Sequence, residues 1–261
     1  FRERCSFVPA RVEEAVAAKI AKQESYRLNE RLGAIYESMS RENPEYLVNA
    51  ASCYVRSGNL IKSVESSWNA VQYAGERMAF DTQLFFCRQA FEFAVRCSRH
   101  GLHSPVDTVE IQIALGDVLM HTGSNEQALG VFEKVLQEDL TIEEYRVLEI
   151  QYKIGTIYHN MGDFEHSIGY FTRTLEQLGI KLPAGKAATV TRLVRELGVQ
   201  VLFSFGLKRL LPKRKGRTIH LSVRILNKLS YSLFFQDMVL CLCVHFKALN
   251  IADRLEDSYE K

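Results

Sequence analysis

Residues 179–186 read GIKLPAGK and invite comparison with a phosphate-binding loop. Such a loop needs four residues between its glycines, a serine or threonine after its lysine, and an apolar strand before it. Here five residues separate Gly179 from Gly185, Ala187 follows Lys186, and a helical pattern precedes the segment. Because this spacing cannot form the phosphate cradle, we interpret the segment as a linker between helices.

Cys241, Cys243 and His245 alternate along the chain and have side chains that bind zinc. On a helix, positions two apart face different directions, so the two thiols cannot readily converge on one ion. We therefore interpret both cysteines as small apolar core residues. The six cysteines of the chain form no CxxC pair and no cluster with zinc spacing, so neither a metal ion nor another cofactor is expected.

The ten residues 208–217 carry six positive charges and no acidic residue. Without these six charges the net charge of the chain would fall from +2 to −4. We interpret the run as a solvated loop between helices, with an anionic membrane surface or an acidic partner as alternatives. Nucleic acid is disfavoured because no aromatic residue is interleaved with the charges. The basic residues are Lys208, Arg209, Lys213, Arg214, Lys215 and Arg217.

Composition sets limits on the class of protein. With 261 residues, 47% hydrophobic and 25% charged, the chain is neither disordered nor a strongly basic nucleic-acid binder as a whole. Unpaired cysteines in apolar helical stretches favour a reducing, cytoplasmic compartment. The N-terminus lacks the apolar core of a signal peptide, and no long uncharged apolar run predicts a transmembrane helix. A first residue other than Met and a last residue inside a helical pattern indicate a piece of a longer protein.

The elements that position these residues are predicted to be helices throughout. All five prolines fall at expected helix boundaries, where they cost no internal hydrogen bond. Ser104-Pro105 is predicted to start one helix, with serine as cap and proline in the first turn. Residues 219–225 alternate like a strand, but the helical spacing continues well past them. Apolar periods predict helices at 78–99, 187–207, 218–236 and 238–257.

Self-similarity is the strongest signal in the sequence. Three anchors, Ala51, Gly116 and Gly155, are each followed by the same series of residue types. The series is a bulky residue, a glycine, a small residue, another large residue and a final small or apolar residue. Ser67 is the exception, because it is small where the series has its second large residue. The offsets are 3, 7, 12, 16 and 19 residues each time. The three series are Tyr54, Gly58, Ser63, Ser67 and Ala70; Leu119, Gly123, Ala128, Phe132 and Val135; and Tyr158, Gly162, Ser167, Phe171 and Thr174.

This pattern resembles the tetratricopeptide repeat. Small residues let the two helices of a repeat approach closely, and the glycine ends the first helix in a left-handed turn at no steric cost. We expect an all-α, tetratricopeptide-like α-solenoid of antiparallel helix pairs. Residues 1–43 would lead into the array, 44–183 would form the repeats, and 184–261 would continue or cap it. The gap between the first two anchors leaves room for one degenerate unit containing helix 78–99.

The chain as a whole is similar to the repeat region of large signalling ATPases of the STAND class. The resemblance lies in RLNERL at 27–32, PEYLVNA at 44–50, LGIKLP at 178–183 and ALNIA at 248–252. Ser52-Cys53 replaces a histidine pair often seen in the first repeat of that region, and the chain holds no ATPase motif. The resemblance therefore implies a nucleotide-binding module in the parent protein and a non-catalytic role for this segment.

Stacked helix pairs create a concave surface that holds peptides or folded domains. Its residues should come from the first helix of each pair, at positions offset from the packing positions. This mixed face suits an internal peptide, a folded domain or the parent's own ATPase. His121 and His159 lie near helix ends, where a cation also suits the helix dipole. The predicted binding residues are Asn49, Ser52, Arg56, Ile113, Asp117, Met120, His121, Tyr152, Thr156, His159 and Asn160.

Three functional hypotheses follow. The segment is a sensor or scaffold arm of a signalling ATPase that binds a protein partner, or an autonomous adaptor that joins two proteins. Alternatively, it attaches to a membrane or an acidic partner through residues 208–217. An enzyme is not expected, because repeat folds carry catalysis only in grafted sites and no such constellation is evident in the sequence.

Overall fold

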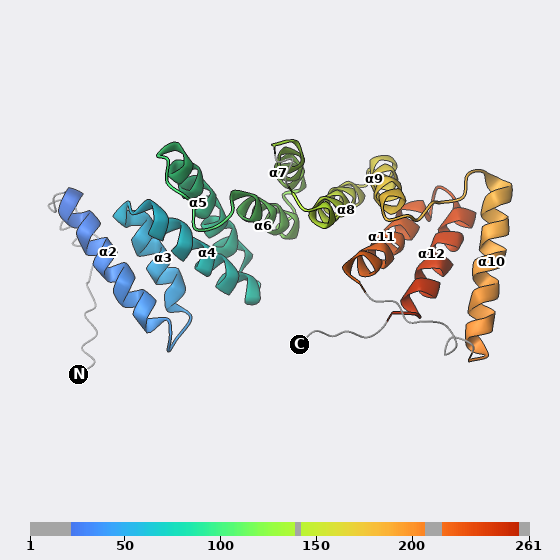
Figure 1. Ribbon diagram of the computed structural model, residues 1–261, viewed down its shortest axis with the longest axis horizontal. Coiled ribbons are helices and arrows are strands. Elements are labelled where there is room, and N and C mark those ends of the chain that lie inside the picture. Colours follow the sequence, from blue (N-terminus) through green and yellow to red (C-terminus); the bar gives the residue numbers. More distant parts are fainter. Residues whose placement is uncertain (1–21, 139–141, 207–215, 256–261) are drawn as a thin grey trace. The chain divides into compact units, whose positions relative to one another are not determined.

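The protein is all-helical in the computed structural model, which describes residues 22–138, 142–206 and 216–255. Within these ranges it contains eleven α-helices and no strand (Figure 1). The helices form antiparallel pairs, so the predicted fold class, a tetratricopeptide-like α-solenoid, is confirmed. The chain divides into two compact units, Phe1–Gln127 and Ala128–Lys261. Among the described helices, none has the length and apolar character needed to cross a membrane.

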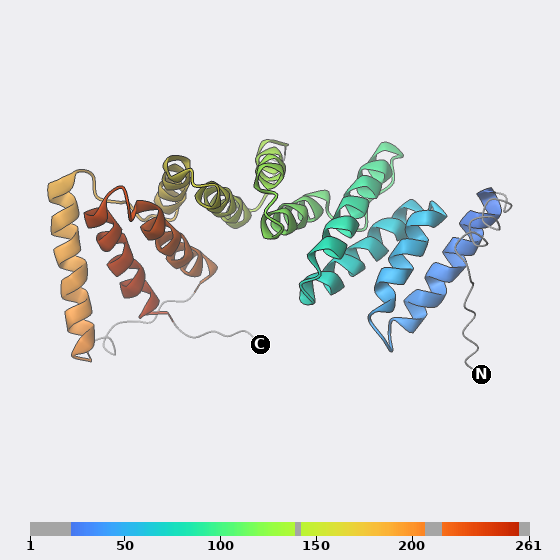
Figure 2. The same cartoon turned by 180° about the vertical axis from the view of Figure 1, so that it is seen from behind.

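The first unit is a succession of helices in which each packs against the next (Figure 2). Short turns separate the first four, whereas residues 100–107 connect the last two. The helices are α2 (Lys22–Met39), α3 (Tyr46–Ser57), α4 (Leu60–Glu76), α5 (Phe80–Arg99) and α6 (Thr108–His121).

Small residues lie where α3 meets α4. Ala51, Ser63 and Ala70 of the first predicted repeat are fully buried. The hydroxyl of Ser63 donates to the backbone oxygen of Tyr54 at 2.9 Å and so joins the two helices. Gly58 ends α3 with a φ of +74°, the left-handed conformation that the repeat pattern requires. The sequence pattern therefore has a direct packing basis in this unit.

The region between the first two anchors contains α5 as one long helix that packs against both α4 and α6. Its bounds agree closely with the predicted helix at 78–99. The predicted helix start at Ser104-Pro105 is wrong, because α6 begins at Thr108 and Asp107 caps it by accepting from the Val109 amide at 3.0 Å. The Ser104 hydroxyl instead donates to the Val106 oxygen within the connection between α5 and α6.

The second unit is built on the hairpin of α8 (Glu144–Asn160) and α9 (Phe164–Gln177), preceded by α7 (Asn125–Glu138), which begins in the first unit. Gly162 makes the turn of the hairpin with a φ of +80°. Asp163 then caps α9 by accepting from the His166 amide at 3.2 Å. The turn at Gly162 and the cap at Asp163 together define where α9 begins.

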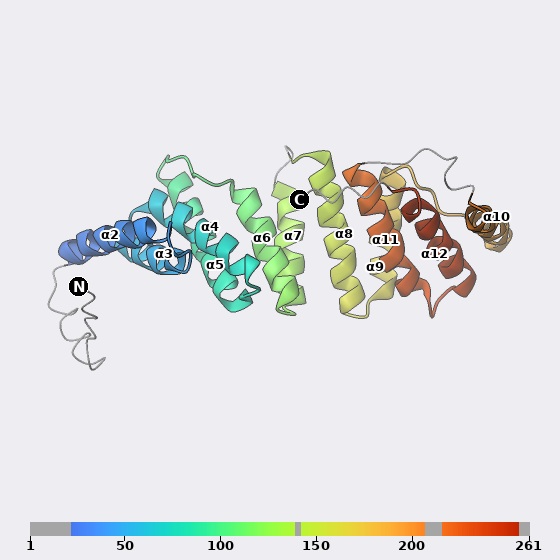
Figure 3. The ribbon, with the colours of Figure 1, turned by 90° about the horizontal axis from the view of Figure 1, so that it is seen from below.

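The remaining helices are α10 (Lys186–Ser204), α11 (Arg217–Leu233) and α12 (Met238–Ala252), and they do not stack in sequence order. The helix that packs on α9 is α11, and α12 packs on α11 (Figure 3). α10 covers the far side of α12. The spatial order of the packed helices is therefore α8, α9, α11, α12 and α10. The α11–α12 hairpin lies between α9 and α10, which precede it in the sequence.

The core of the second unit lies among α8, α9, α11 and α12. Phe171 and Leu175 of α9 are fully buried in one cluster with Leu221, Ile225 and Leu229 of α11. Leu221, Ile225 and Leu229 are spaced by four residues, so they lie on one face of α11. α12 is apolar on more than one face because it is enclosed between α11 and α10.

Candidate functional site

The helix α10 turns polar residues inward. Its buried residues are Thr189 and Glu196, whereas Val194 and Val201 are 63% and 55% exposed. Val199 and Phe203 are half-buried. A surface helix normally buries its apolar stripe, so this arrangement is partly reversed. Such a reversal requires that the buried polar groups be satisfied by partners.

Glu196 is the centre of that polar contact. One carboxylate oxygen, Oε1, accepts from Arg192 Nε at 3.0 Å and from Arg195 Nη2 at 3.2 Å. The other, Oε2, accepts from Asn250 Nδ2 of α12 at 2.7 Å. Burial acts to raise the pKa of this carboxyl, but the Asn250 hydrogen bond and the two arginines outweigh it and lower the pKa below its ordinary value. The carboxylate is therefore held in its charged form.

A second layer of hydrogen bonds fixes Asn250 itself. Its amide nitrogen also donates to the backbone oxygen of Glu196 at 3.0 Å, and its oxygen accepts from Gln200 Nε2 at 2.7 Å. Arg192, Glu196 and Gln200 are spaced by four residues, so they lie on one face of α10. This face and Asn250 make a specific joint between α10 and α12.

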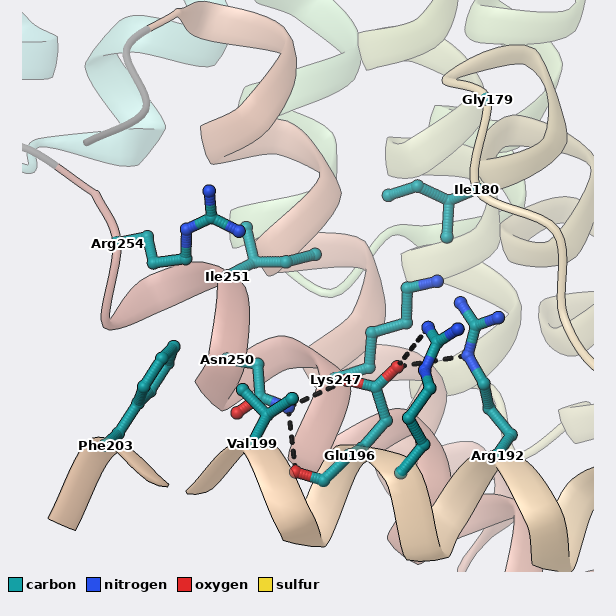
Figure 4. Close-up of a pocket in the computed structure, with 11 residues that line it drawn as sticks. Gly179, Ile180, Arg192, Glu196, Val199, Phe203, Lys247, Asn250, Ile251 and Arg254 are labelled. Atoms are coloured by element: carbon teal, nitrogen blue, oxygen red, sulfur yellow. Dashed lines mark hydrogen bonds and ion pairs between the residues drawn. The ribbon is translucent and has the colours of Figure 1, made fainter. Parts of the chain in front are cut away.

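A pocket of about 460 Å³ lies beside this joint, between α10, α12 and the turn after α9 (Figure 4). Ile180 from the turn, Val199 and Phe203 from α10, and Ile251 from α12 supply its apolar lining. Its charged lining consists of four cationic residues and a single carboxylate, that of Glu196. The cationic residues are Arg192, Arg195, Lys247 and Arg254.

Lys247 carries the excess of positive charge. Figure 4 shows the ends of Lys247 and Arg192 directed to the same region beside the Glu196 carboxylate. Burial, followed by the charge of Arg192, lowers the pKa of the Lys247 ammonium, and the Glu196 carboxylate only partly opposes these effects. The pocket thus holds more positive charge than its own carboxylate balances.

The lining of this pocket is suited to binding. Its carboxylate is already held by three donors. Guanidinium and ammonium groups above an apolar wall are suited to an anion with an organic part. Among the described residues, no group of three or more histidine, cysteine or acidic side chains is arranged to hold a metal ion.

The binding residues predicted on α3 lie on the helix surface. Asn49 and Arg56 are exposed, and Ser52 between them is half-buried with its hydroxyl donating to the Val48 oxygen at 2.9 Å. Positions three and four apart share a face, so these side chains form one surface strip.

On α6 the predicted residues are less accessible. Ile113, Asp117 and Met120 are half-buried, while His121 is exposed and stacks on Phe80 of α5 with ring centroids 5.1 Å apart. The histidine therefore contacts its own fold as well as solvent.

The predicted residues on α8 are mostly taken up by the protein itself. Tyr152 and Thr156 are buried, and the Arg224 guanidinium of α11 lies 4.8 Å from the centre of the Tyr152 ring. His159 Nδ1 lies 2.9 Å from Ser232 Oγ, also on α11. Among the four, Asn160 is exposed. Because α11 packs against α8, the strip on α8 faces this helix at the positions expected to face a ligand.

Most of the basic run at 208–217 lies outside the described residues. The basic residues concerned are Lys208, Arg209, Lys213, Arg214 and Lys215. Arg217 is the first residue of α11 and is exposed.

The pocket between α10 and α12 was not predicted from the sequence. The available signal was the charged group Arg192, Arg195 and Glu196 within an otherwise apolar helix, and an asparagine, Asn250, within the apolar α12. Only the out-of-order packing of α10 on α12 brings these two signals together, and spacing along the chain does not reveal that packing.

Comparison with known proteins supports the repeat. Residues 148–176 match the tetratricopeptide repeat family, and they cover most of α8 and α9. No curated protein sequence matches the chain. Among solved structures, the chain is similar to BtubC (BKLC) from P. vanneervenii, at 13% identity and a TM-score of 0.39, over 90% of this chain and 92% of that one. The α8–α9 hairpin is thus a tetratricopeptide repeat by both its sequence match and its packing.

Proposed function

We propose that this chain is a non-catalytic interaction segment that binds a protein partner on its helical surface. The observation that carries the proposal is the tetratricopeptide hairpin of α8 and α9, because arrays of such hairpins present extended surfaces to peptides and domains.

The partner surface we propose is the strip on α3. Asn49 and Arg56 remain exposed there, whereas α11 covers Tyr152 and Thr156 of the corresponding strip on α8. Exposed His121 and Asn160 are further candidates at the ends of α6 and α8. A mixed strip of this kind suits an internal peptide or a folded domain better than a terminal carboxylate, which would need several clustered cationic side chains.

The exposed apolar residues of α10 form a second candidate surface. Val190, Val194 and Val201 recur at helical spacing and are exposed. Apolar side chains grouped on one exposed face commonly mark an interaction site. The experiment below therefore tests both surfaces.

We further propose that the segment is an arm of a signalling ATPase of the STAND class, as its resemblance to that repeat region implies. An autonomous adaptor is the alternative. The full-length gene product decides between them, because a phosphate-binding loop in it supports the ATPase arm and the lack of one supports the adaptor.

Affinity capture from a cell lysate, with the 261-residue chain as bait, tests both candidate surfaces. The strip variant Asn49→Arg/Arg56→Glu is compared with the α10 variant Val194→Gln/Val201→Gln and with the wild type. All four positions are exposed, so circular dichroism should show equal helicity. We expect proteins captured by the wild type to be lost with the strip variant and kept with the α10 variant. Loss with the α10 variant alone would move the site to α10, and equal capture by all three would refute both surfaces.

A further inference from the structure

We propose that the pocket between α10 and α12 binds a small organic phosphate, with the phosphate among Arg192, Arg195 and Lys247 and the organic part against Val199 and Phe203. The proposal stands apart from the protein-binding surface on α3. It rests on charge, prearranged donors, and the shape of the pocket.

The first step is the imbalance of charge. Four cationic residues and one carboxylate line the pocket, and that carboxylate is buried and already bonded to two of the cations. Folding brings these cations together at an electrostatic cost, which an anion in the pocket would offset. A phosphate monoester carries close to two negative charges near neutral pH and would therefore balance most of this excess.

The second step is the prearrangement of donors. Glu196 holds Arg192 through Nε and Arg195 through Nη2, so each guanidinium is fixed by one of its nitrogens. A guanidinium has five N–H donors in a rigid planar fork, and forks of this kind bind phosphate oxygens in pairs. Asn250 in turn fixes Glu196 and is itself held by Gln200, so a bound phosphate would meet donors that are already oriented.

Lys247 supplies the third step. Its ammonium is not needed to hold the joint, because Glu196 receives its hydrogen bonds from Arg192, Arg195 and Asn250. Burial and the neighbouring Arg192 lower its pKa, and an anion beside it would stabilise the ammonium form. Lys247 is half-buried among other cations in the pocket, which makes it a candidate ligand-binding group.

The pocket also selects the class of anion. Its volume of about 460 Å³ exceeds what a free phosphate ion needs and falls within the range of small-molecule sites. Val199, Phe203 and Ile251 line it together with the charged groups. An organic part that covers these apolar side chains would gain affinity over inorganic phosphate.

Isothermal titration calorimetry on the 261-residue chain tests the proposal with phenyl phosphate as the probe. At about pH 7.5 the probe is dianionic, because its second pKa is about 6. We expect phenyl phosphate to bind more tightly than inorganic phosphate, and benzyl alcohol not to bind. AMP and glucose 6-phosphate then distinguish a nucleotide source from a sugar phosphate source. No binding of any phosphate ester at millimolar concentration would refute the site, and equal affinity for inorganic phosphate would refute the organic subsite.

The matched variants are Lys247→Met, which keeps the apolar stem, and Lys186→Met at the exposed start of α10, which does not line the pocket. We expect Lys247→Met to weaken phenyl phosphate binding by about tenfold or more, while its thermal midpoint stays equal or rises. Lys186→Met should bind like the wild type. Arg195→Gln, which leaves Arg192 and Asn250 on Glu196, gives a second variant and should also weaken binding. Unchanged affinity in both pocket variants, or equal weakening by Lys186→Met, would overturn the proposal.

Discussion

Gly155 of α8 faces the ring of Phe171 of α9 so closely that a Cβ atom placed on the glycine would lie 2.6 Å from the ring atom Cε1. Both residues are buried, and Phe171 has no exposed surface. The glycine is needed here for close approach and not for an unusual backbone conformation, because it lies in the middle of a regular helix. This contact lets the two helices of the repeat pack closely at this point.

The first prediction concerns that contact. Gly155→Ala should lower the free energy of unfolding by about 1–3 kcal/mol, because the ring must shift within a packed core. Chemical denaturation monitored by circular dichroism would measure the change. Gly169→Ala on α9 is the matched control, since a Cβ there meets no atom within 4 Å. The control should be neutral or stabilising by up to about 1 kcal/mol, owing to the higher helix propensity of alanine. Equal effects of the two substitutions would contradict the role of Gly155.

Much of the repeat could be predicted from the sequence, because local spacing determines it. The six-position pattern at Gly155 predicted the turn at Gly162, and the structure confirms it. The packing of the Phe171 ring against Gly155 was not predicted and comes from the structure. Such a pattern works because each repeat is a hairpin whose contacts lie within about 34 residues. Its requirements for small residues and for a left-handed turn are visible in residue types alone.

The pocket could not be predicted, because it depends on contacts between residues far apart in the chain. Glu196 and Asn250 are 54 residues apart, and they meet only because α11 and α12 insert between α9 and α10. The apolar spacing of α10 gives the opposite expectation, since Val194 and Val201 face away from α12. For the same reason, α11 covers Tyr152, which was predicted to bind a partner.

The second prediction concerns Glu196. Glu196→Gln should lower the free energy of unfolding by about 1–3 kcal/mol, because the two arginines lose their carboxylate while remaining close to Lys247. Glu176→Gln at the exposed end of α9 is the control and should stay within about 0.5 kcal/mol of the wild type.

The pH dependence of that difference has a defined sign. Because the folded-state pKa of Glu196 is below its ordinary value of 4.5, the unfolded chain binds this proton more readily than the folded one. The contribution of Glu196 is therefore present above pH 4.5 and is lost as the pH falls through the folded-state pKa. Denaturation curves in a series of acidic buffers should show the wild type and Glu196→Gln converging at low pH. A constant difference would contradict this assignment.

The third prediction concerns thiol reactivity. Cys53 is half-buried, whereas Cys87, Cys97, Cys241 and Cys243 are buried. Burial raises the pKa of the Cys87 thiol to about 12, so very little of it is the reactive thiolate at neutral pH. In a Cys5→Ser background, which removes the thiol outside the described residues, Cys53 should react first with a thiol reagent. Adding Cys53→Ser should abolish that fast phase in the native protein, while denaturant should release the four remaining thiols. A fast phase that survives Cys53→Ser would contradict the burial of the others.

The fourth prediction concerns His159, where three helices meet. Its Nδ1 lies 2.9 Å from Ser232 Oγ on α11, and Ser167 Oγ of α9 lies 3.2 Å from the same oxygen. Burial, and then the charge of Lys228, lowers the pKa of His159 below its ordinary value of 6.5. The folded protein therefore binds this proton less readily than the unfolded chain does. As the pH falls below 6.5, the free energy of unfolding should decrease.

A substitution isolates this histidine from the others in the chain. His159→Gln keeps a hydrogen-bonding group near Ser232 but does not titrate, so its free energy of unfolding should vary less between about pH 7.5 and pH 5.5 than that of the wild type. His100→Gln, at the exposed end of α5, should keep the pH dependence of the wild type. Urea denaturation at each pH measures all three proteins. If His159→Gln retained the full pH dependence, the proton would be taken up elsewhere, and the contact with Ser232 would not be the reason that the α8–α11 interface weakens in acid.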